Sequence, residues 1–272
     1  MHRTRIDRSR VPSQPVDSSE KAAELLRLHA DPELLVVVNV WDVIGARVLA
    51  DLPGTKALAT TSHSIAATFG YADGEQMPLD LMIDMVGRIA GAVEVPVSAD
   101  LEAGYGDPGE TTRRAIGVGV VGANLEDQMR PLPDAVAAMA AVVKAGEAEG
   151  VPFVLNARTD AFLRSGDRDR KDVIAAAVER GRAYLDAGAA CVFVPGLLDE
   201  PTVTALVEGI GERRVSVINL PGSLPQARLA ELGVARVSFG AFTQRATLTY
   251  FADMAIDLYA GGALPEGVRP LN

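Results

Sequence analysis

The fold of this chain is most restricted by a regular alternation of short apolar segments with longer helical segments. The apolar segments have the length of strands, and their nearly continuous apolar pattern is typical of strands buried on both faces of a parallel sheet. Strands are predicted at residues 34–40, 56–61, 95–99, 120–125, 153–158, 191–195, 215–220 and 236–240. Helices are predicted at 17 to about 29, 43–51, 79–92, from 108 onward, 133–150, 169–187, 200–209, 225–232 and 241 to about 259.

The number and spacing of these segments predict the fold class. Eight strands that alternate with helices over 272 residues favour a (β/α)8 barrel, an α/β fold, over an open sheet. We predict one barrel domain over residues 17–272 with a C-terminal helical extension. Residues 1–16 carry four arginines but no apolar segment, so they are predicted to be a mobile tail and not a secretory signal.

Acidic residues follow two neighbouring predicted strands at the point where each strand ends. Asp100 and Glu102 follow one strand, and Glu126 and Asp127 follow the next. One helix separates these strands, which makes them parallel and brings both groups of acids to the same edge of the sheet. Converging carboxylates repel one another, and a hard divalent cation keeps them ionised. The pattern predicts a Mg²⁺ site, with Mn²⁺ as the alternative ion. In the other reading these acids cap helices or are solvated.

Polar side chains also follow the second predicted strand, at the end where active sites of this fold lie. Thr61 and Ser62 would offer N–H groups and hydroxyls to a carboxylate at the start of a short helix. His63 is interpreted either as a base or anion contact, or as a residue that only forms hydrogen bonds within its loop. Trp41 follows the first strand and either lines or fills the mouth of the barrel.

Arg158 is a candidate contact for a substrate carboxylate. It lies at the end of the strand predicted at 153–158, where its guanidinium fork can hold a carboxylate through two hydrogen bonds. The alternative is a structural salt bridge to Asp160 or Glu126, and both roles are compatible.

The composition restricts the partners and the cellular location. Acidic residues outnumber basic residues by 36 to 26, and the net charge of −10 disfavours binding to nucleic acid or to an anionic membrane. No apolar run reaches the ~18 residues that a membrane helix needs. The single cysteine, Cys191, excludes an internal disulfide and a cysteine-rich zinc site, and favours the cytoplasm.

Two enzyme classes are disfavoured by the positions of their key residues. Glycines 117, 119 and 122 have the GxGxxG spacing, but they close a predicted helix and enter a strand, whereas a dinucleotide site needs the opposite order. A Schiff-base enzyme needs a lysine at the catalytic end of a strand. Lys56 lies at the wrong end of its strand, so imine chemistry is not expected.

Five segments in a fixed order resemble the isocitrate lyase/phosphoenolpyruvate mutase superfamily. The resemblance extends from about residue 38 to residue 240. It implies a β/α barrel, a last helix exchanged between the subunits of a homodimer or of a homotetramer built from two dimers, Mg²⁺, and a small α-oxo-acid substrate. The matching segments are Thr61-Ser62, Gly70-Tyr71-Ala72-Asp73, Asp100-Leu101-Glu102-Ala103-Gly104-Tyr105-Gly106, Leu125-Glu126-Asp127-Gln128 and Ala157-Arg158-Thr159-Asp160.

The resemblance assigns the metal to three acids. Asp100 is expected to be the direct ligand, and Glu102 and Glu126 are expected to hold the ion through water. Many members have aspartate where this chain has Glu102, which lengthens one arm of the metal shell.

The resemblance also assigns the substrate contacts. Thr61 and Ser62 would bind the oxo-acid carboxylate, Arg158 would contact the substrate, and Asp73 corresponds to a loop aspartate. Asn219 and Ser238 lie on late strands, which contribute polar groups in some members.

The segment after Gln128 departs from the superfamily pattern. It reads Met129-Arg130-Pro131-Leu132, in place of the Lys-Cys-Gly-His gate of the isocitrate and methylisocitrate lyases or the Lys-Thr-Asn-Ser gate of the phosphonate mutases. The thiol that donates a proton in the lyases is therefore missing, because Cys191 is on a different strand.

These features predict a Mg²⁺-dependent carbon–carbon lyase acting through an enolate on a small α-oxo or α-hydroxy di- or tricarboxylate. Oxaloacetate decarboxylation needs no thiol acid, because carbon dioxide leaves and solvent protonates the enolate. A methylisocitrate or isocitrate lyase-like retro-aldol cleavage is the next candidate, with Tyr105 or His63 handling the proton. The alternatives are phosphonopyruvate-type P–C cleavage with Asp73 near the metal, or a non-catalytic oxo-acid-binding protein.

Overall fold

The computed structural model describes residues 17–271, so the predicted tail at 1–16 lies outside the described residues. The strands are β1 Leu35–Val36, β2 Val38–Val40, β3 Leu58–Thr60, β4 Val97–Asp100, β5 Gly122–Glu126, β6 Val154–Arg158, β7 Cys191–Val194, β8 Val215–Ile218 and β9 Arg236–Ser238. The helices are α1 Ser18–Ala30, α2 Val43–Ala50, α3 Ser62–Thr68, α4 Leu79–Ala90, α5 Pro108–Gly117, α6 Leu132–Ala148, α7 Arg170–Asp186, α8 Glu200–Ile210, α9 Gln226–Glu231 and α10 Phe242–Tyr259.

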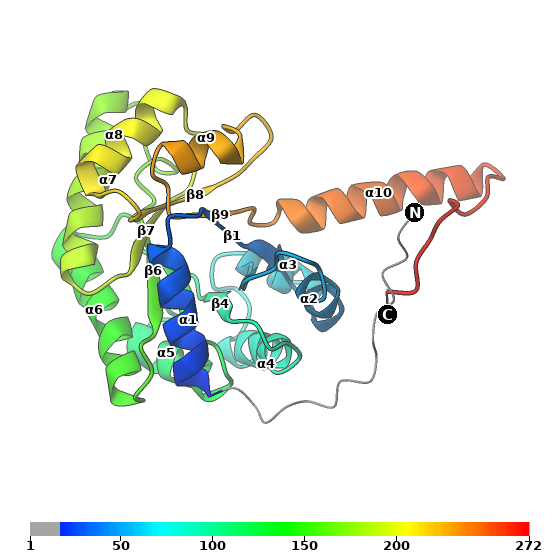
Figure 1. Ribbon diagram of the computed structural model, residues 1–272, viewed down its shortest axis with the longest axis horizontal. Helices are drawn as coiled ribbons and strands as arrows, with labels where there is room; N and C mark the ends of the chain where they lie inside the picture. Colours follow the sequence, from blue (N-terminus) through cyan, green and yellow to red (C-terminus); the bar gives the residue numbers. More distant parts are fainter. Residues whose placement is uncertain (1–16, 272) are drawn as a thin grey trace.

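All of these strands are parallel, and they confirm the predicted (β/α)8 barrel (Figure 1). The strand predicted at 34–40 is divided at Val37 into β1 and β2. β1 pairs with β9, whereas β2 pairs with β3, so the two halves join the edges of the sheet. The Val37 amide donates to the Val237 carbonyl at 3.0 Å and continues the pairing with β9. This change of partner follows from the stagger between neighbouring strands that a closed barrel requires.

Helix α1 covers the end of the barrel at which the strands begin. Asp17 caps the helix by accepting a hydrogen bond from the Ser19 amide. Its apolar face, formed by Ala22, Leu25 and Leu28, packs into a buried cluster with residues at the starts of several strands. The opposite end, at which the strands finish, is therefore not covered by α1.

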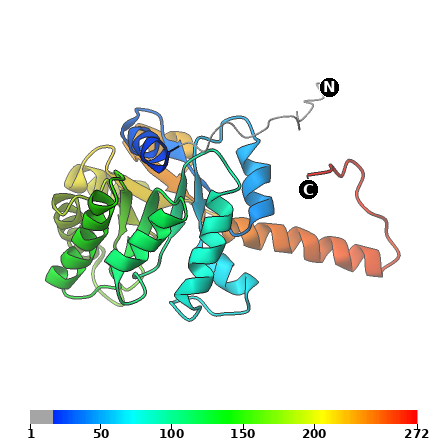
Figure 2. The same ribbon diagram turned by 90° about the horizontal axis from the view of Figure 1, so that it is seen from below.

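Apart from α10, the other helices lie outside the barrel and cover its strands (Figure 2). One buried apolar cluster joins β3 and β4 to α4 and α5, and a second joins β7 and β8 to α7, α8 and α9. Within residues 17–271 no helix has both the length and the apolar character needed to cross a membrane.

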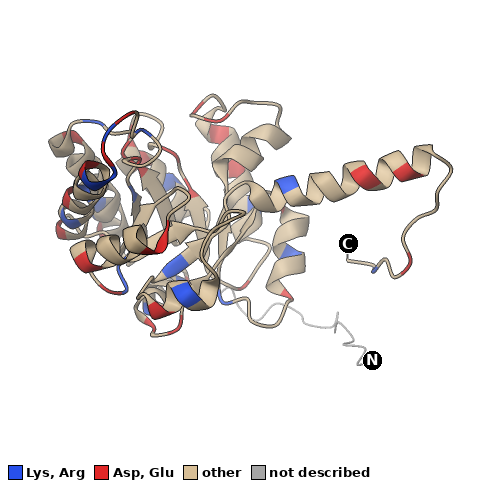
Figure 3. Ribbon diagram, turned by 90° about the horizontal axis from the view of Figure 1, so that it is seen from above, with Lys and Arg blue, Asp and Glu red and all other residues tan. Residues whose placement is uncertain are grey.

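Helix α10 projects away from the barrel (Figure 1). Along it only Gln244, near its start, is buried. Charged residues are sparse on this helix compared with the helices around the barrel (Figure 3). Large apolar side chains are exposed instead, among them Tyr250 at 62%, Phe251 at 60% and Tyr259 at 92%.

The predicted boundaries agree with the structure to within about two residues for most elements. Helix α3 confirms the short helix that was expected after the second predicted strand, and it has seven residues. It begins at Ser62, so its first turn lies at the catalytic end of the barrel.

Candidate active site at the carboxyl ends of the strands

Three ionisable side chains lie at the last positions of β4, β5 and β6. Asp100 pairs in register with Asn124, and Glu126 pairs with Arg158. Paired residues on neighbouring strands point to the same face, and successive residues on a strand alternate between faces. Asp100, Glu126 and Arg158 therefore share one face of the closed sheet at its carboxyl end, as the spacing predicted.

Asp100 is held against the start of α3. Its Oδ2 accepts hydrogen bonds from the Ser62 amide at 3.1 Å and from the Ser62 hydroxyl at 2.8 Å. The Asp100 amide donates to Thr60 Oγ1 at 2.9 Å, which ties β4 to β3. Ser62 Oγ also lies 3.3 Å from Asp73 Oδ1. The structure thus brings together three of the predicted site residues: Ser62, Asp73 and Asp100.

Glu102 lies in a tight turn after β4. Its backbone is in the left-handed region at φ 52°, which is uncommon for a residue with a side chain. One carboxylate oxygen accepts from the Tyr105 hydroxyl at 2.6 Å, and the other accepts from the Glu75 amide. The Glu75 carboxylate in turn accepts from the amides of Ala103 and Tyr105 at 3.2 and 2.6 Å. These reciprocal bonds fasten the loop that carries Asp73 to the turn that carries Glu102.

Arg158 lies between two carboxylates. Its Nη1 is 2.9 Å from Glu126 Oε2, and its Nε donates to Asp160 Oδ1 at 2.7 Å. The salt bridges considered as alternatives in the sequence are both present. Gln128 Nε2 lies 3.3 Å from the second oxygen of Glu126, so the side chain of Glu126 is held on both sides.

Asp127 is completely buried and faces away from the mouth. Its Oδ2 accepts from the Tyr184 hydroxyl at 2.6 Å and from Arg180 at 3.0 Å, both on α7. Its Oδ1 accepts from the amides of Met129 and Asp160 at 2.9 and 3.0 Å. One carboxylate therefore joins the loops after β5 and β6 to α7, and so fixes the residues beside Glu126 and Arg158.

Burial dominates the electrostatics of this mouth. It raises the pKa of Glu126 to about 7, although the adjacent Arg158 lowers it, and Asp160 and Asp100 raise it further. The pKa of Glu102 is also raised, chiefly by burial and in part by Asp100 and Asp73. Burial raises the pKa of Tyr105, as does its hydrogen bond to the Glu102 carboxylate, so this phenol stays protonated.

The donor chemistry fits a divalent cation held mostly through water. Among residues 17–271, no group of three or more histidine, cysteine, aspartate or glutamate side chains lies close enough to bind a metal directly. Mg²⁺ commonly binds through one or two carboxylates and keeps several waters. Two acids with raised pKa values beside Asp100 are the groups that such an ion would return to the ionised form. The assignment of Asp100 as direct ligand, with Glu102 and Glu126 acting through water, stays a prediction.

In the metal-free protein we expect the free energy of unfolding to fall as the pH rises from 4.5, the ordinary pKa of the Glu126 side chain, to about 7. The raised pKa of Glu126 makes the folded state bind more protons in this window. The stabilisation that Glu126 provides is complete below pH 4.5 and is lost as the pH passes about 7. The expected loss is roughly 1 to 3 kcal/mol. Urea unfolding in EDTA at several pH values measures it.

Two variants control this pH experiment. Glu126→Gln should flatten the pH dependence, whereas Glu110→Gln, at an exposed acid on α5, should leave it unchanged. An equal slope in wild type and Glu126→Gln would contradict the assignment of the raised pKa to this carboxyl.

The remaining predicted residues lie at the rim. The exposed His63 has Nδ1 3.3 Å from Asp73 Oδ2, so it forms the contact within its loop region that was considered for it. Thr61 is buried at the N-terminus of α3. Trp41 packs partly buried against the apolar cluster of β3 and β4. Asn219 donates to the Leu224 carbonyl at 3.1 Å, which stabilises the loop after β8.

Three residues of the site were missed in the sequence: Glu75, Arg180 and Tyr184. Asp127 was included among the acids of the edge, but strand alternation already places it on the face opposite Glu126. That alternation was the available signal. Nothing local to Glu75 or Arg180 indicates their contacts, because they lie 27 and 53 residues from their partners Glu102 and Asp127.

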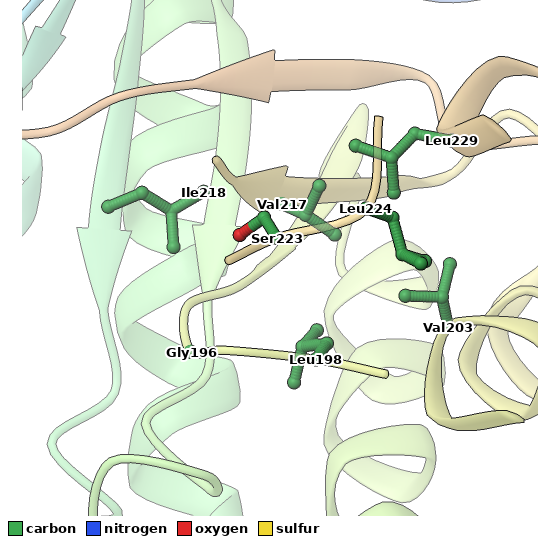
Figure 4. A pocket seen from close by; sticks show the side chains of 8 residues that line it. All are labelled: Gly196, Leu198, Val203, Val217, Ile218, Ser223, Leu224 and Leu229. Atoms are coloured by element: carbon green, nitrogen blue, oxygen red, sulfur yellow. The ribbon is translucent and has the colours of Figure 1, made fainter. Parts of the chain in front are cut away.

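Figure 4 shows a small pocket between β8, α8 and α9, and none of the residues of the acidic mouth lines it. Its volume is about 10 Å³, which is room for roughly one water molecule. It is lined by Gly196, Leu198, Val203, Val217, Ile218, Ser223, Leu224 and Leu229. Mostly aliphatic and outside the acidic mouth, it does not qualify as the ligand site.

Comparison with known proteins connects this geometry to a family. Residues 25–259 match the family model described as phosphoenolpyruvate phosphomutase. An uncharacterized protein of Mycobacterium tuberculosis (strain ATCC 25618 / H37Rv) is 34% identical over 244 residues, which cover 89% of this chain and 91% of that protein. Other relatives include proteins named isocitrate lyase, 2-methylisocitrate lyase and 2,3-dimethylmalate lyase.

Two solved structures have the same fold. A Burkholderia cenocepacia J2315 protein with the provisional name phosphonomutase has a TM-score of 0.82 and 39% identity, covering 87% of this chain and 99% of its own. Oxaloacetate acetylhydrolase in complex with oxalate has a TM-score of 0.82 and 26% identity, covering 94% and 92%. The chain therefore belongs to the phosphoenolpyruvate phosphomutase family, within the isocitrate lyase/phosphoenolpyruvate mutase superfamily that its motifs resemble.

Proposed function

We propose that this protein is a Mg²⁺-dependent carbon–carbon lyase that cleaves a small α-oxo or α-hydroxy di- or tricarboxylate through an enolate. One observation carries the proposal. Arg158 is held between Glu126 and Asp160 at the same barrel mouth as Asp100. Its fixed guanidinium group therefore faces a cluster of carboxylates suited to a metal. The names of the relatives support this class, since they include lyases of isocitrate, 2-methylisocitrate and 2,3-dimethylmalate.

Asp100 would hold the ion directly, with Glu102 and Glu126 acting through water. The bound ion would supply positive charge beside the substrate oxygen on which negative charge develops. Ser62 and Thr61, at the start of α3, would bind the substrate carboxylate. Within the described residues Arg158 uses Nη1 and Nε for its two acids, which leaves the N–H groups of Nη2 for the enolate oxygen.

The proton donors present at the mouth favour a reaction that needs no thiol as an acid. In oxaloacetate decarboxylation the bond to the departing carboxylate breaks, its electron pair stays on the enolate, and a solvent proton then completes pyruvate. In a retro-aldol cleavage the substrate hydroxyl must lose a proton, and the departing enolate must gain one. Tyr105 is the better placed of the two proton donors considered, because its hydroxyl already forms a hydrogen bond with Glu102, whereas His63 is exposed beside Asp73.

A substrate panel tests this function. The protein with Mg²⁺ is incubated with oxaloacetate, 2-methylisocitrate, 2,3-dimethylmalate and phosphonopyruvate, and the products are followed by NMR. Pyruvate, or another product of carbon–carbon cleavage, formed above the rate with Mg²⁺ alone supports the proposal. Binding of oxalate without turnover of any compound would instead support a non-catalytic oxo-acid-binding protein.

Phosphonopyruvate-type P–C cleavage is a second candidate. It is favoured by the family description, by the name of the Burkholderia structure, and by the placement of Asp73 within 3.3 Å of Ser62 Oγ, beside Asp100. Cleavage of phosphonopyruvate alone in the same panel would select it over the carbon–carbon lyase.

We also propose that α10 packs against a second copy of the chain in a homodimer or homotetramer. A helix that exposes Leu248, Tyr250, Phe251 and Ile256 has an apolar surface typical of an interface. Phe251→Glu is expected to raise the dissociation constant of the oligomer at least about tenfold, because it buries a charge in that interface. Asp253→Asn, on the same helix, is the control. Sedimentation velocity measures both, and a monomeric wild type would contradict the proposal.

A further inference from the structure

The loop between α3 and α4 carries an acid, Glu75, to which the proposed mechanism gives no role. Its carboxylate oxygen Oε1 accepts hydrogen bonds from two backbone amides of the turn after β4. These are the amides of Ala103 at 3.2 Å and of Tyr105 at 2.6 Å. Within residues 17–271 neither amide has a second acceptor. This part of the turn therefore depends on Glu75 for its hydrogen bonds.

The turn that Glu75 holds is strained. Glu102 and Tyr105 have backbones in the left-handed region, at φ 52° and 51°, and Glu75 itself has φ 61°. Residues with side chains keep this conformation only where surrounding contacts hold them in it. Strained residues of this kind gather at functional sites. Three of them are joined here by one group of hydrogen bonds, and Glu75 provides the acceptor from outside the turn.

The turn presents two functional groups at the mouth. The Tyr105 hydroxyl donates to one oxygen of Glu102 at 2.6 Å, and the Glu75 amide donates to the other oxygen. The Glu102 backbone is fixed separately, because its carbonyl accepts from the Glu126 amide at 2.8 Å. The Tyr105 backbone lies three residues further on, where its amide is bound by Glu75. The placement of the phenol, and of the carboxylate that it binds, thus depends on Glu75.

We propose that Glu75 is a positioning residue for the reaction at this mouth, an inference that rests on the proposed function. Its carboxylate would hold the turn, and the turn would hold Glu102 where it can bind the ion through water. Only Oε1 takes part in these contacts, so Glu75 acts as a hydrogen-bond acceptor and not as a charge. Substrate binding is left to other groups, and Glu75 should therefore affect turnover more than KM.

Two substitutions separate an acceptor from a charge. Glu75→Ala removes the acceptor and should lower kcat roughly 10- to 100-fold, with KM changed less than about threefold. Glu75→Gln keeps a carbonyl oxygen for the two amides, so kcat should stay within about threefold of wild type. The matched control is Gln76→Ala, next in the chain. The Gln76 side chain donates only to the Gly74 carbonyl of its own loop, and its removal should leave kcat unchanged.

Hydrogen exchange followed by mass spectrometry gives a readout that needs neither metal nor substrate. In Glu75→Ala a peptide spanning residues 101–107 should exchange at least about tenfold faster than in wild type, while the barrel strands keep their wild-type rates. Glu75→Gln should exchange like wild type. A calorimetric titration of Mg²⁺ in the presence of oxalate adds a second readout. Binding should weaken at least about threefold in Glu75→Ala, because Glu102 is no longer held in place.

Four results would overturn the proposal. The first is wild-type exchange of residues 101–107 in Glu75→Ala, and the second is faster exchange throughout the barrel, which indicates a role in folding alone. The third is faster local exchange with unchanged kcat and Mg²⁺ affinity. The fourth is a Glu75→Gln variant as impaired as Glu75→Ala, since the charge would then be the essential feature.

Failure of this inference is distinguishable from failure of the proposed function. A wild-type protein that binds Mg²⁺ and oxalate but cleaves no compound of the panel would refute the lyase, and exchange with the Mg²⁺ titration would still decide the role of Glu75. Equal turnover by wild type and Glu75→Ala would leave the lyase standing and refute the positioning role.

Discussion

Replacing Asp100 by asparagine is expected to reduce kcat/KM for the substrate that the panel identifies by about 10³-fold. Asparagine retains an oxygen that can accept from the Ser62 amide and hydroxyl, so α3 should keep its place. The substitution removes the negative charge that would hold the cation. The loss should therefore appear in turnover and in the heat of Mg²⁺ binding in the presence of oxalate, with little change in thermal unfolding.

Asp107→Asn provides the matched control for this experiment. Asp107 is an acid of the same loop, and its side chain caps α5 by accepting from the Glu110 amide at 3.0 Å. The same change of charge should leave kcat/KM within about twofold, and it should cost at most roughly 1 kcal/mol of stability. If Asp100→Asn kept more than a tenth of the wild-type activity, the metal assignment would be wrong.

Replacing Asp127 by alanine is expected to lower the free energy of unfolding by about 3 to 5 kcal/mol. The carboxylate is completely buried and satisfies two backbone amides, the Tyr184 hydroxyl and Arg180. Its removal leaves these donors without an acceptor and leaves the charge of Arg180 only partly compensated. Activity should fall as well, because the loops that carry Glu126 and Arg158 lose their common anchor. Urea unfolding and steady-state kinetics measure the two effects.

Two variants separate this network from a general effect of acid removal. Tyr184→Phe removes one of the four hydrogen bonds to Asp127, together with the one that the Tyr184 hydroxyl accepts from Arg180, and should cost only about 1 to 2 kcal/mol. Asp134→Ala removes an exposed acid in the first turn of α6 and should change the stability by less than about 0.5 kcal/mol. A loss below 1 kcal/mol for Asp127→Ala would show that the network does not anchor the loops.

Two segments at the mouth, the one that begins at Met129 and the loop that carries Asp73, are each held in place by hydrogen bonds. Where the lyases have a thiol after the second acidic strand, this protein has Met129 and Arg130, and Arg130 donates to the Asp127 carbonyl at 3.2 Å. On the other side of the mouth, Glu75 fastens the loop of Asp73 to the turn of Glu102. In the proposed reaction the proton would therefore come from solvent, or in a retro-aldol cleavage from Tyr105, which donates to Glu102, and not from a cysteine.

Most of the fold could be predicted because its signals are local. Apolar segments of strand length, the capping residues Asp17 and Asp107, and the regular spacing of helices all act over a few residues. The division of the first strand into β1 and β2 could not be predicted in this way. It arises because the sheet closes into a barrel, so that the chain changes at Val37 from pairing with β9 to pairing with β3.

The sequence by itself determined the barrel and the strands at which its acids and Arg158 emerge, because strand period and helix caps depend on neighbouring residues. Only the tertiary structure decided which of the pairings considered for Arg158 form, and how the other groups are paired. Arg158 joins Glu126 and Asp160, Asp127 turns to α7, and Glu75 reaches Glu102. Most of these contacts join residues far apart in the chain, and their geometry exists only when the sheet closes, so no local pattern encodes them.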